Sequence, residues 1–166
     1  MIATAHRPLI KLPPLHPRQR EIALDDARFK VAAAGRRFGK TRLGAALCMM
    51  TAGAGGRAWW VAPTYPVAQV GWRLIRRMAL QIPGAEVRQA ERIATLPNGG
   101  EIQVRSADNP DSLRGEGLDF VVMDECAFIH EDAWQEALRP ALADRKGRAL
   151  FISTPKGRNW FWRLWQ

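Results

Sequence analysis

The fold of this chain is decided by the stretch Ala34-Gly35-Arg36-Arg37-Phe38-Gly39-Lys40-Thr41. An apolar run, residues 29–34, leads into it, and residues 41–50, which are small and helix-forming, follow it. A strand, a glycine-containing loop and a helix in this order are the setting in which a P-loop (Walker A) binds phosphate. The strict pattern begins with glycine, whereas this chain has alanine first and glycine second. The stretch therefore predicts a phosphate-binding loop with one small departure from the pattern.

Each residue type in this loop has a physical reason. Gly39 has no Cβ, so the backbone can approach a phosphate closely and turn its N–H groups toward it. The helix that begins near Thr41 adds unpaired N–H groups and the positive end of its dipole. Lys40 is expected to reach the β- and γ-phosphates of ATP, and the Thr41 hydroxyl to ligate Mg²⁺. The alternative is an ordinary strand–helix turn that carries a surface lysine.

A pair of carboxylates, Asp124 and Glu125, follows the apolar run 118–123. Adjacent charges at the end of a buried strand are costly unless they face a cation or water. In open α/β sheets, ligands bind at the carboxyl ends of the strands. We expect Asp124 to hold Mg²⁺ together with Thr41, and Glu125 to polarise the attacking water as the general base (Walker B). The alternative is a strand-ending turn before a helix.

Arginine is a further requirement, because charge develops on the transferred phosphoryl group. An arginine finger accelerates such reactions by roughly 10³–10⁵. Arg36 and Arg37 lie within the loop and could act in cis. Arg114 lies in a predicted loop before the acidic pair, and Arg139 follows it. Each of the four could be an ordinary surface arginine, but at least one is expected to act on the nucleotide.

The remaining sequence predicts an α/β fold of the P-loop NTPase type, with a mainly parallel central sheet flanked by helices on both faces. Residues 1–17 are proline-rich and predict an extended arm, which leaves 18–166 as the ATPase core. Apolar periodicity places Val67 and Val70 on one face of a predicted helix. The predicted strands are 29–34, 57–62, 118–123 and 149–153, with a hairpin over 93–105 and helices over 17–27, 66–80 and 131–142. An aromatic segment, 158–166, is expected to pack against the core or another domain rather than on bases.

Composition favours a polyanionic partner. The 166 residues hold 25 Lys and Arg against 16 Asp and Glu, a formal net charge of +9. Arginine, which matches phosphate with its planar fork, dominates the cations, so nucleic acid is the natural candidate. The alternative is an arginine-rich coding bias. No base-reading helix is evident, so DNA binding should be independent of sequence and sensitive to salt.

Other functions find little support. Cys48 and Cys126 have no nearby cysteine partner, and the three histidines show no metal-ligand spacing, so both thiols are expected to be reduced and inert. No segment has the apolar length of a membrane span or a signal peptide. The chain is therefore expected to be cytoplasmic.

Several segments, taken together and in order, resemble the large subunit of the terminases that package DNA in tailed bacteriophages. The likeness runs from about Pro14 to Phe161, and the ordered set is far more specific than any one member. Besides residues 34–41, the segments are His16-Pro17-Arg18-Gln19, Ser112-Leu113-Arg114-Gly115, residues 121–127, residues 138–142 and residues 152–159.

The resemblance implies roles for residues that spacing alone does not assign. Gln19 would read the adenine edge, and Arg36 or Arg37 would sense the γ-phosphate. Arg114 would be offered as a finger to the neighbouring subunit of a ring. Ser153-Thr154-Pro155 would form the motif that couples hydrolysis to DNA movement, with Ser153 and Thr154 as its functional residues. The fold would be the subclass (ASCE) with an extra strand between the two Walker strands.

The resemblance also implies a function: Mg²⁺-dependent hydrolysis of ATP that drives double-stranded DNA into a viral capsid, in the cytoplasm of an infected bacterium. The expected partners are DNA, a portal and a small terminase subunit. Copies of the same chain are expected to form a pentameric ring when active, and the isolated chain could instead be a monomer. The family's nuclease region cannot fit into 166 residues, so no nuclease activity is expected. The alternatives are a non-catalytic remnant that binds nucleotide or DNA, and a helicase-like translocase.

Overall fold

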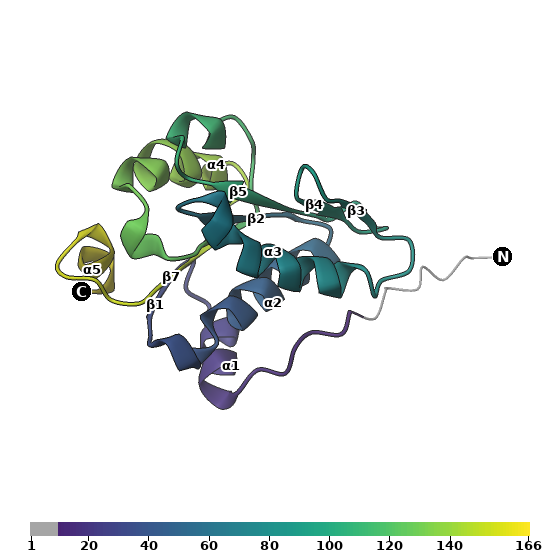
Figure 1. Cartoon of the computed structure of the whole chain (residues 1–166), viewed down its shortest axis with the longest axis horizontal. Helices are drawn as coiled ribbons and strands as arrows, with labels where there is room; N and C mark the ends of the chain where they lie inside the picture. Colours follow the sequence, from purple (N-terminus) through teal and green to yellow (C-terminus); the bar gives the residue numbers. More distant parts are fainter. Residues whose placement is uncertain (1–9) are drawn as a thin grey trace.

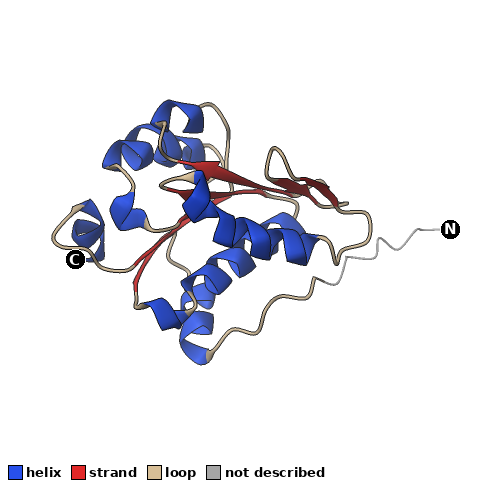
Figure 2. Ribbon diagram, viewed as in Figure 1, coloured by secondary structure: helices blue, strands red, loops and turns tan. Residues whose placement is uncertain are grey.

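A seven-stranded sheet runs through the molecule in the order β1-β7-β6-β2-β5-β4-β3. The computed structural model describes residues 10–166, with helices on both faces of this sheet (Figures 1 and 2). The first five strands of that order are parallel, and β4 and β3 continue the sheet antiparallel. The strands are β1 (Phe29–Ala33), β2 (Arg57–Ala62), β3 (Glu86–Arg88), β4 (Ile93–Thr95), β5 (Glu101–Ser106), β6 (Phe120–Met123) and β7 (Arg148–Ser153).

Two apolar cores lie on opposite faces of the sheet. The first is formed with α1 (Pro17–Leu24), α2 (Lys40–Gly53) and α3 (Tyr65–Ala79). The second is formed with the π-helical η4 (Ala133–Leu138), α4 (Arg139–Ala143) and α5 (Trp160–Trp165). Short 3-10 turns, η1 (Arg36–Phe38), η2 (Pro110–Leu113) and η3 (Cys126–Phe128), connect elements at the strand ends. The predicted fold class, with helices on both faces of a mainly parallel sheet, is confirmed.

Strand β2 shows how one strand supplies both cores. Successive side chains of a strand point to opposite faces, so Trp59 enters the second core and Trp60 the first. Both tryptophans are completely buried. Trp60 lies against Gly44 of α2 and Gly71 of α3, where an added Cβ would collide with its ring. The two glycines therefore let both helices approach the sheet closely.

The order of the strands places β7 between β1 and β6, with parallel pairing on both sides. Strand β1 leads into the P-loop, and β6 leads into the acidic pair. The extra strand between the two Walker strands, which the family resemblance implied, is therefore present. Because the three strands are parallel, their carboxyl ends lie at the same edge of the sheet.

Several predicted boundaries need correction. The first helix ends at Leu24 rather than at residue 27. Directly after it, the Asp25 side chain accepts a hydrogen bond from Ala27 N at 2.7 Å, and this local bond competes with helical bonding. The helix predicted over 131–142 is present over 131–143, but its middle, η4, is π-helical, and α4, with Pro140 as its second residue, follows it. Proline has no N–H to donate to the regular helical ladder. Strand β3 was not predicted, because it is short and mostly exposed.

The N-terminal arm remains a prediction. Residues 1–9 of the predicted arm lie outside the described residues, and residues 10–16 have no regular secondary structure. Within residues 10–166, no helix has the length and apolar character that crossing a bilayer requires.

Candidate nucleotide-binding site

The P-loop and the acidic pair meet in one pocket of about 800 Å³ at the carboxyl edge of the sheet. Its lining includes Lys40 and Thr41 of the P-loop together with the two acidic residues, Asp124 and Glu125. The two groups are 84 positions apart in sequence (124 − 40) and are brought together by the parallel alignment of β1, β7 and β6. The other lining residues are Arg36, Gly39, Val67, Val70, Phe128, Thr154, Pro155 and Lys156.

The loop has the backbone shape that phosphate binding requires. Gly39 has a φ of 78°, in the left-handed region that favours glycine, and it precedes the first residue of α2. The first bond of the following helix runs from Leu43 N to Gly39 O at 3.1 Å, so the N–H groups of Lys40 and Thr41 precede the helical ladder. Together with the helix dipole, such groups make a binding site for an anion.

Lys40 is 7% exposed, although it carries a charge. Its Nζ donates hydrogen bonds to the carbonyl oxygens of Ala34, at 2.7 Å, and Gly35, at 2.9 Å. These bonds offset the cost of burying the ammonium group. The lysine is therefore held over the loop, with its charge at the pocket that the phosphates would enter.

Asp124 is 6% exposed, and its Oδ1 accepts a hydrogen bond from Glu125 N at 3.0 Å. Burial, together with the neighbouring Glu125 charge, raises the pKa of this carboxyl to about 7, although the backbone hydrogen bond and Lys40 partly offset the rise. A buried carboxylate with so high a pKa is suited to binding a cation, which would replace the proton.

Glu125 has a φ of 47°, which is unusual for a residue with a Cβ. Such conformations cost of order 1–3 kcal/mol and cluster at active sites. The conformation turns the chain directly after β6, and the residue lines the pocket next to Asp124.

The donor set fits Mg²⁺, because the Thr41 hydroxyl and the Asp124 carboxylate supply the oxygen ligands that this ion prefers. Among residues 10–166 there is no group of three or more His, Cys, Asp and Glu side chains that could hold a metal. A magnesium ion at this site would thus take its remaining ligands from phosphate oxygens and water, as is usual for this ion.

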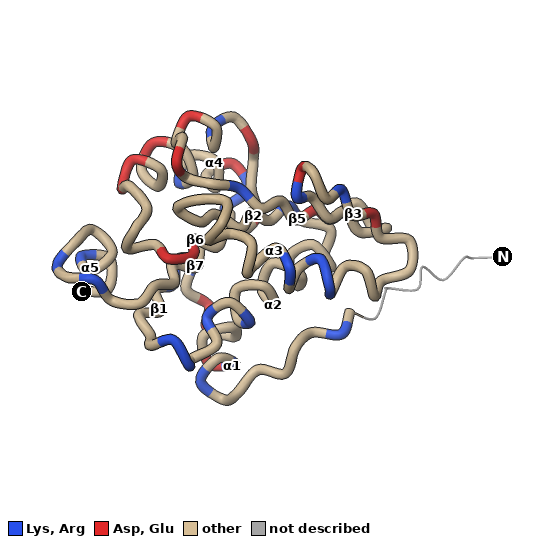
Figure 3. The backbone as a smooth tube through the Cα atoms, viewed as in Figure 1, with Lys and Arg blue, Asp and Glu red and all other residues tan. Residues whose placement is uncertain are grey.

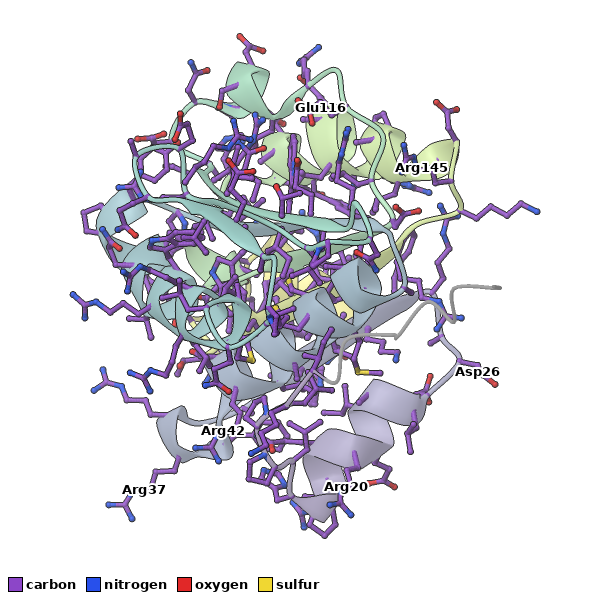
Figure 4. All side chains as sticks on the ribbon, turned by 90° about the vertical axis from the view of Figure 1, so that its right-hand side faces the viewer. Arg20, Asp26, Arg37, Arg42, Glu116 and Arg145 are labelled. Carbon is purple, nitrogen blue, oxygen red and sulfur yellow. The ribbon has the colours of Figure 1, made fainter. Side chains whose placement is uncertain are left out.

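The predicted arginines are separated by the structure. Both loop arginines are exposed, but Arg36 lines the pocket, whereas Arg37 projects from the loop into solvent (Figure 4). Arg114 lies elsewhere and forms ion pairs with Asp111 at 3.3 Å and Glu136 at 2.9 Å. Within one chain, Arg36 is thus placed at the pocket and Arg114 is not.

Gln19 lies behind the P-loop and is not among the residues that line the pocket. It is 2% exposed, and its Nε2 donates to Phe38 O at 2.8 Å and Gly39 O at 3.0 Å. Both amide hydrogens are therefore directed at the loop. Contact with adenine would require the side chain to leave these carbonyl groups, so adenine reading remains a prediction.

The predicted coupling residues connect the two Walker segments. Ser153 is completely buried. Its Oγ accepts a hydrogen bond from Ala127 N at 3.2 Å and donates one to Thr154 O at 3.0 Å. Its backbone oxygen accepts a hydrogen bond from Ala34 N at 3.3 Å. Thr154, the next residue, lines the pocket. The segment thus contacts the start of the P-loop and the turn after the acidic pair.

Four pocket residues were not found from the sequence. Val67 and Val70, which periodicity placed on the apolar face of α3, are 36% and 56% exposed and line the pocket mouth. Phe128 and Lys156 also line the pocket, with the Lys156 Nζ 4.2 Å from the centroid of the Phe128 ring. The two valines occur near the N-terminus of α3, at the edge of the sheet, where an apolar residue can face the pocket instead of the core.

A parallel sheet with a strand between the two Walker strands, and a glycine-containing loop facing an acidic pair, defines the class of P-loop NTPases. Residues 31–166 match the family described as terminase large subunit, T4likevirus-type, N-terminal. The chain therefore belongs to the terminase large subunit family.

Relatives agree with this assignment. The chain is 36% identical over 175 residues to the large terminase subunit of Thermus virus P23-45, with 90% of this chain and 35% of the relative covered. It is 36% identical over 148 residues to that of Escherichia phage T5, with 84% and 33% covered. The large terminase ATPase domain of Thermus phage P74-26 superimposes with a TM-score of 0.76 at 35% identity, over 91% of this chain and 68% of that one. The chain thus spans about a third of the length of these curated relatives.

Proposed function

We propose that this chain binds ATP with Mg²⁺ and hydrolyses it, as the ATPase core of a large terminase that moves double-stranded DNA into a viral capsid. The observation that carries the proposal is the pocket shared by the Lys40-Thr41 loop and the Asp124-Glu125 pair. Family membership supports the same activity.

Each pocket residue has a separate task in this mechanism. Lys40 and the first N–H groups of α2 bind the β- and γ-phosphates, while Thr41 and Asp124 hold Mg²⁺. The ion, when bound, neutralises charge on the phosphate oxygens. Glu125 orients a water for attack on the γ-phosphorus and accepts its proton. Arg36 adds positive charge at the phosphates from within the same chain.

The coupling of hydrolysis to DNA is assigned to Ser153 and Thr154. The support for this assignment is geometric. Thr154 lines the pocket, and Ser153 is hydrogen-bonded both to the start of the P-loop and to the turn that follows the acidic pair. A change in the phosphates would therefore reach two strand ends through one short segment. Double-stranded DNA as the moved polymer is supported by the net charge of +9.

The remaining partners follow from the family. In this proposal the chain works in the cytoplasm of an infected bacterium, in a pentameric ring with a portal and a small terminase subunit. Arg114 would then complete the site of a neighbouring subunit, which agrees with its distance from the pocket of its own chain.

The proposal is tested by two substitutions in the pocket. Lys40→Ala should abolish nucleotide binding, because the phosphates lose their main cation. Glu125→Ala should bind ATP but lower turnover by roughly 10²-fold or more, the usual contribution of a general base. Nucleotide binding is measured by calorimetry and turnover by phosphate release, with Glu91→Ala, an exposed carboxylate outside the pocket, as the control. Turnover at the wild-type rate in Glu125→Ala would refute the assignment of the base.

A further inference from the structure

Two side chains of the N-terminal segment hold the P-loop from behind. Gln19 Nε2 donates to the carbonyl oxygens of Phe38 and Gly39, at 2.8 and 3.0 Å. His16 Nε2 lies 3.0 Å from the same Phe38 oxygen. The His16 ring also meets the Phe38 ring edge to face, with centroids 5.0 Å apart and an interplanar angle of 86°. Three polar contacts and an aromatic contact thus converge on one turn of the loop.

The hydrogen bonds of His16 determine its tautomer. A carbonyl oxygen only accepts, so Nε2 carries the hydrogen that faces Phe38 O. Nδ1 accepts from Gln19 N at 3.3 Å, and Gln19 Oε1 accepts from His16 N at 3.0 Å. This reciprocal pair is a capping box at the start of α1. The cap therefore orients both side chains toward the loop.

The loop has a physical need for such contacts. A turn that directs its N–H groups at phosphate directs some carbonyl groups the other way, and these need donors of their own. Gly39 makes the turn possible with a φ of 78°, and a Cβ on it would lie 2.6 Å from Gln19 Nε2. The absence of a side chain at Gly39 therefore serves the contact with Gln19 as well as the backbone turn.

We propose that His16 and Gln19 are positioning residues that hold the Phe38–Gly39 turn in its phosphate-binding shape. The inference rests on the proposed nucleotide binding and assigns to Gln19 an action on the phosphate loop rather than on the base. Their contribution is to the affinity for any nucleoside triphosphate, because the turn they hold faces the phosphates. His16 gains a role that the family resemblance did not assign.

Gln19→Glu tests the amide. The carboxylate keeps the shape and the acceptor for His16 N, but it cannot donate to Phe38 O or Gly39 O. Affinities for ATP and for GTP should fall alike, by roughly 5- to 100-fold for two lost hydrogen bonds. The control is Arg20→Gln, which changes the charge equally at a side chain that points away from the loop (Figure 4). A loss confined to ATP would show base reading, and unchanged affinities would show no role; either result overturns the proposal.

Two substitutions at His16 separate the cap from the loop contact. His16→Asn keeps a good capping oxygen but is too short to reach Phe38 O, whereas the longer amide of His16→Gln can donate there. We expect roughly three- to tenfold weaker ATP binding and a higher KM for His16→Asn, an unchanged thermal midpoint, and recovery in His16→Gln. Wild-type affinity in His16→Asn, or an equal loss in both variants, would contradict the proposal.

Hydrogen exchange of residues 36–40 without nucleotide gives a readout that does not depend on ATP. The amides of this turn should exchange faster in Gln19→Glu and His16→Asn than in the wild type, because the turn loses its support. Unchanged exchange would overturn the positioning role. Absence of ATP binding by the wild type would instead refute the proposed function, so the two failures can be told apart.

Discussion

At the scale of single residues, Asp124 shows what the site costs the chain when no cation is bound. Its carboxyl is buried, and its pKa is raised to about 7 by desolvation and by Glu125. In the unfolded chain the same group titrates near its ordinary value of 3.8. The folded state therefore favours the protonated carboxyl, and this contribution to stability is lost as the pH rises through about 7.

Replacing Asp124 with asparagine should reveal this loss. Between pH 5 and pH 8, without nucleotide, the free energy of unfolding of the wild type should fall relative to Asp124→Asn by on the order of 2–3 kcal/mol. The asparagine has no charge to bury at either pH. The measurement is denaturant unfolding across this pH range, with the exposed Asp108→Asn as the control. A difference between wild type and Asp124→Asn that stays constant with pH would contradict the pKa shift.

At the scale of elements, the P-loop helix α2 is held in place by its packing on β2 and α3. The Trp60 ring fills the space that Gly44 and Gly71 leave on the two helices. This contact fixes the distance of α2 from the sheet and so the position of Lys40 at its first turn. The site thus depends on a packing contact one helical turn along α2 from Lys40.

Gly71→Ala should destabilise the protein although alanine favours helix. The gain in helix propensity is about 1 kcal/mol, whereas forcing a methyl group into a packed core costs about 1–3 kcal/mol. A Cβ at Gly71 would collide with the Trp60 ring, so we expect the second effect to prevail, with a net loss of up to about 2 kcal/mol. Denaturant unfolding measures it, with Arg73→Ala on the exposed face of α3 as the control. Greater stability of Gly71→Ala would show that the core has room there.

At the scale of the whole molecule, charges are unevenly distributed. Figure 3 shows many acidic residues around α4 and many basic ones along α3 and around α1. Arg114 lies on the acidic side, held by exposed ion pairs with Asp111 and Glu136. Exposed pairs contribute about 0–1 kcal/mol, so breaking them costs little, as the proposed action of Arg114 in a neighbouring subunit requires.

The proposed action of Arg114 in a neighbour predicts a dependence on protein concentration. The ATPase rate per wild-type chain should rise with protein concentration, with or without duplex DNA. The rate of Arg114→Ala should stay roughly 10³-fold below that of the wild type at every concentration, although this variant should bind ATP normally. Arg163→Ala, which removes another exposed, ion-paired arginine, is the control. A wild-type rate independent of concentration, or full activity in Arg114→Ala, would contradict a finger supplied in trans.

Most of the fold could be predicted from the sequence. Strand β2 was predicted with its observed bounds, and β1, β6 and β7 within one or two residues, because buried strands are continuous apolar runs between turns. The P-loop and the acidic pair were recognisable because their chemistry demands particular residues directly after a strand. The meeting of the two segments followed from the rule that parallel strands end at one edge.

Contacts between segments that are distant in sequence were decided only by the tertiary structure. Gln19 bonds to the P-loop, Arg114 lies away from the pocket of its own chain, and Val70 faces the pocket instead of the core. Spacing along the chain determines local backbone conformation and which positions share a face. It does not determine which partner a long polar side chain reaches, since that depends on how helices and loops pack over the sheet.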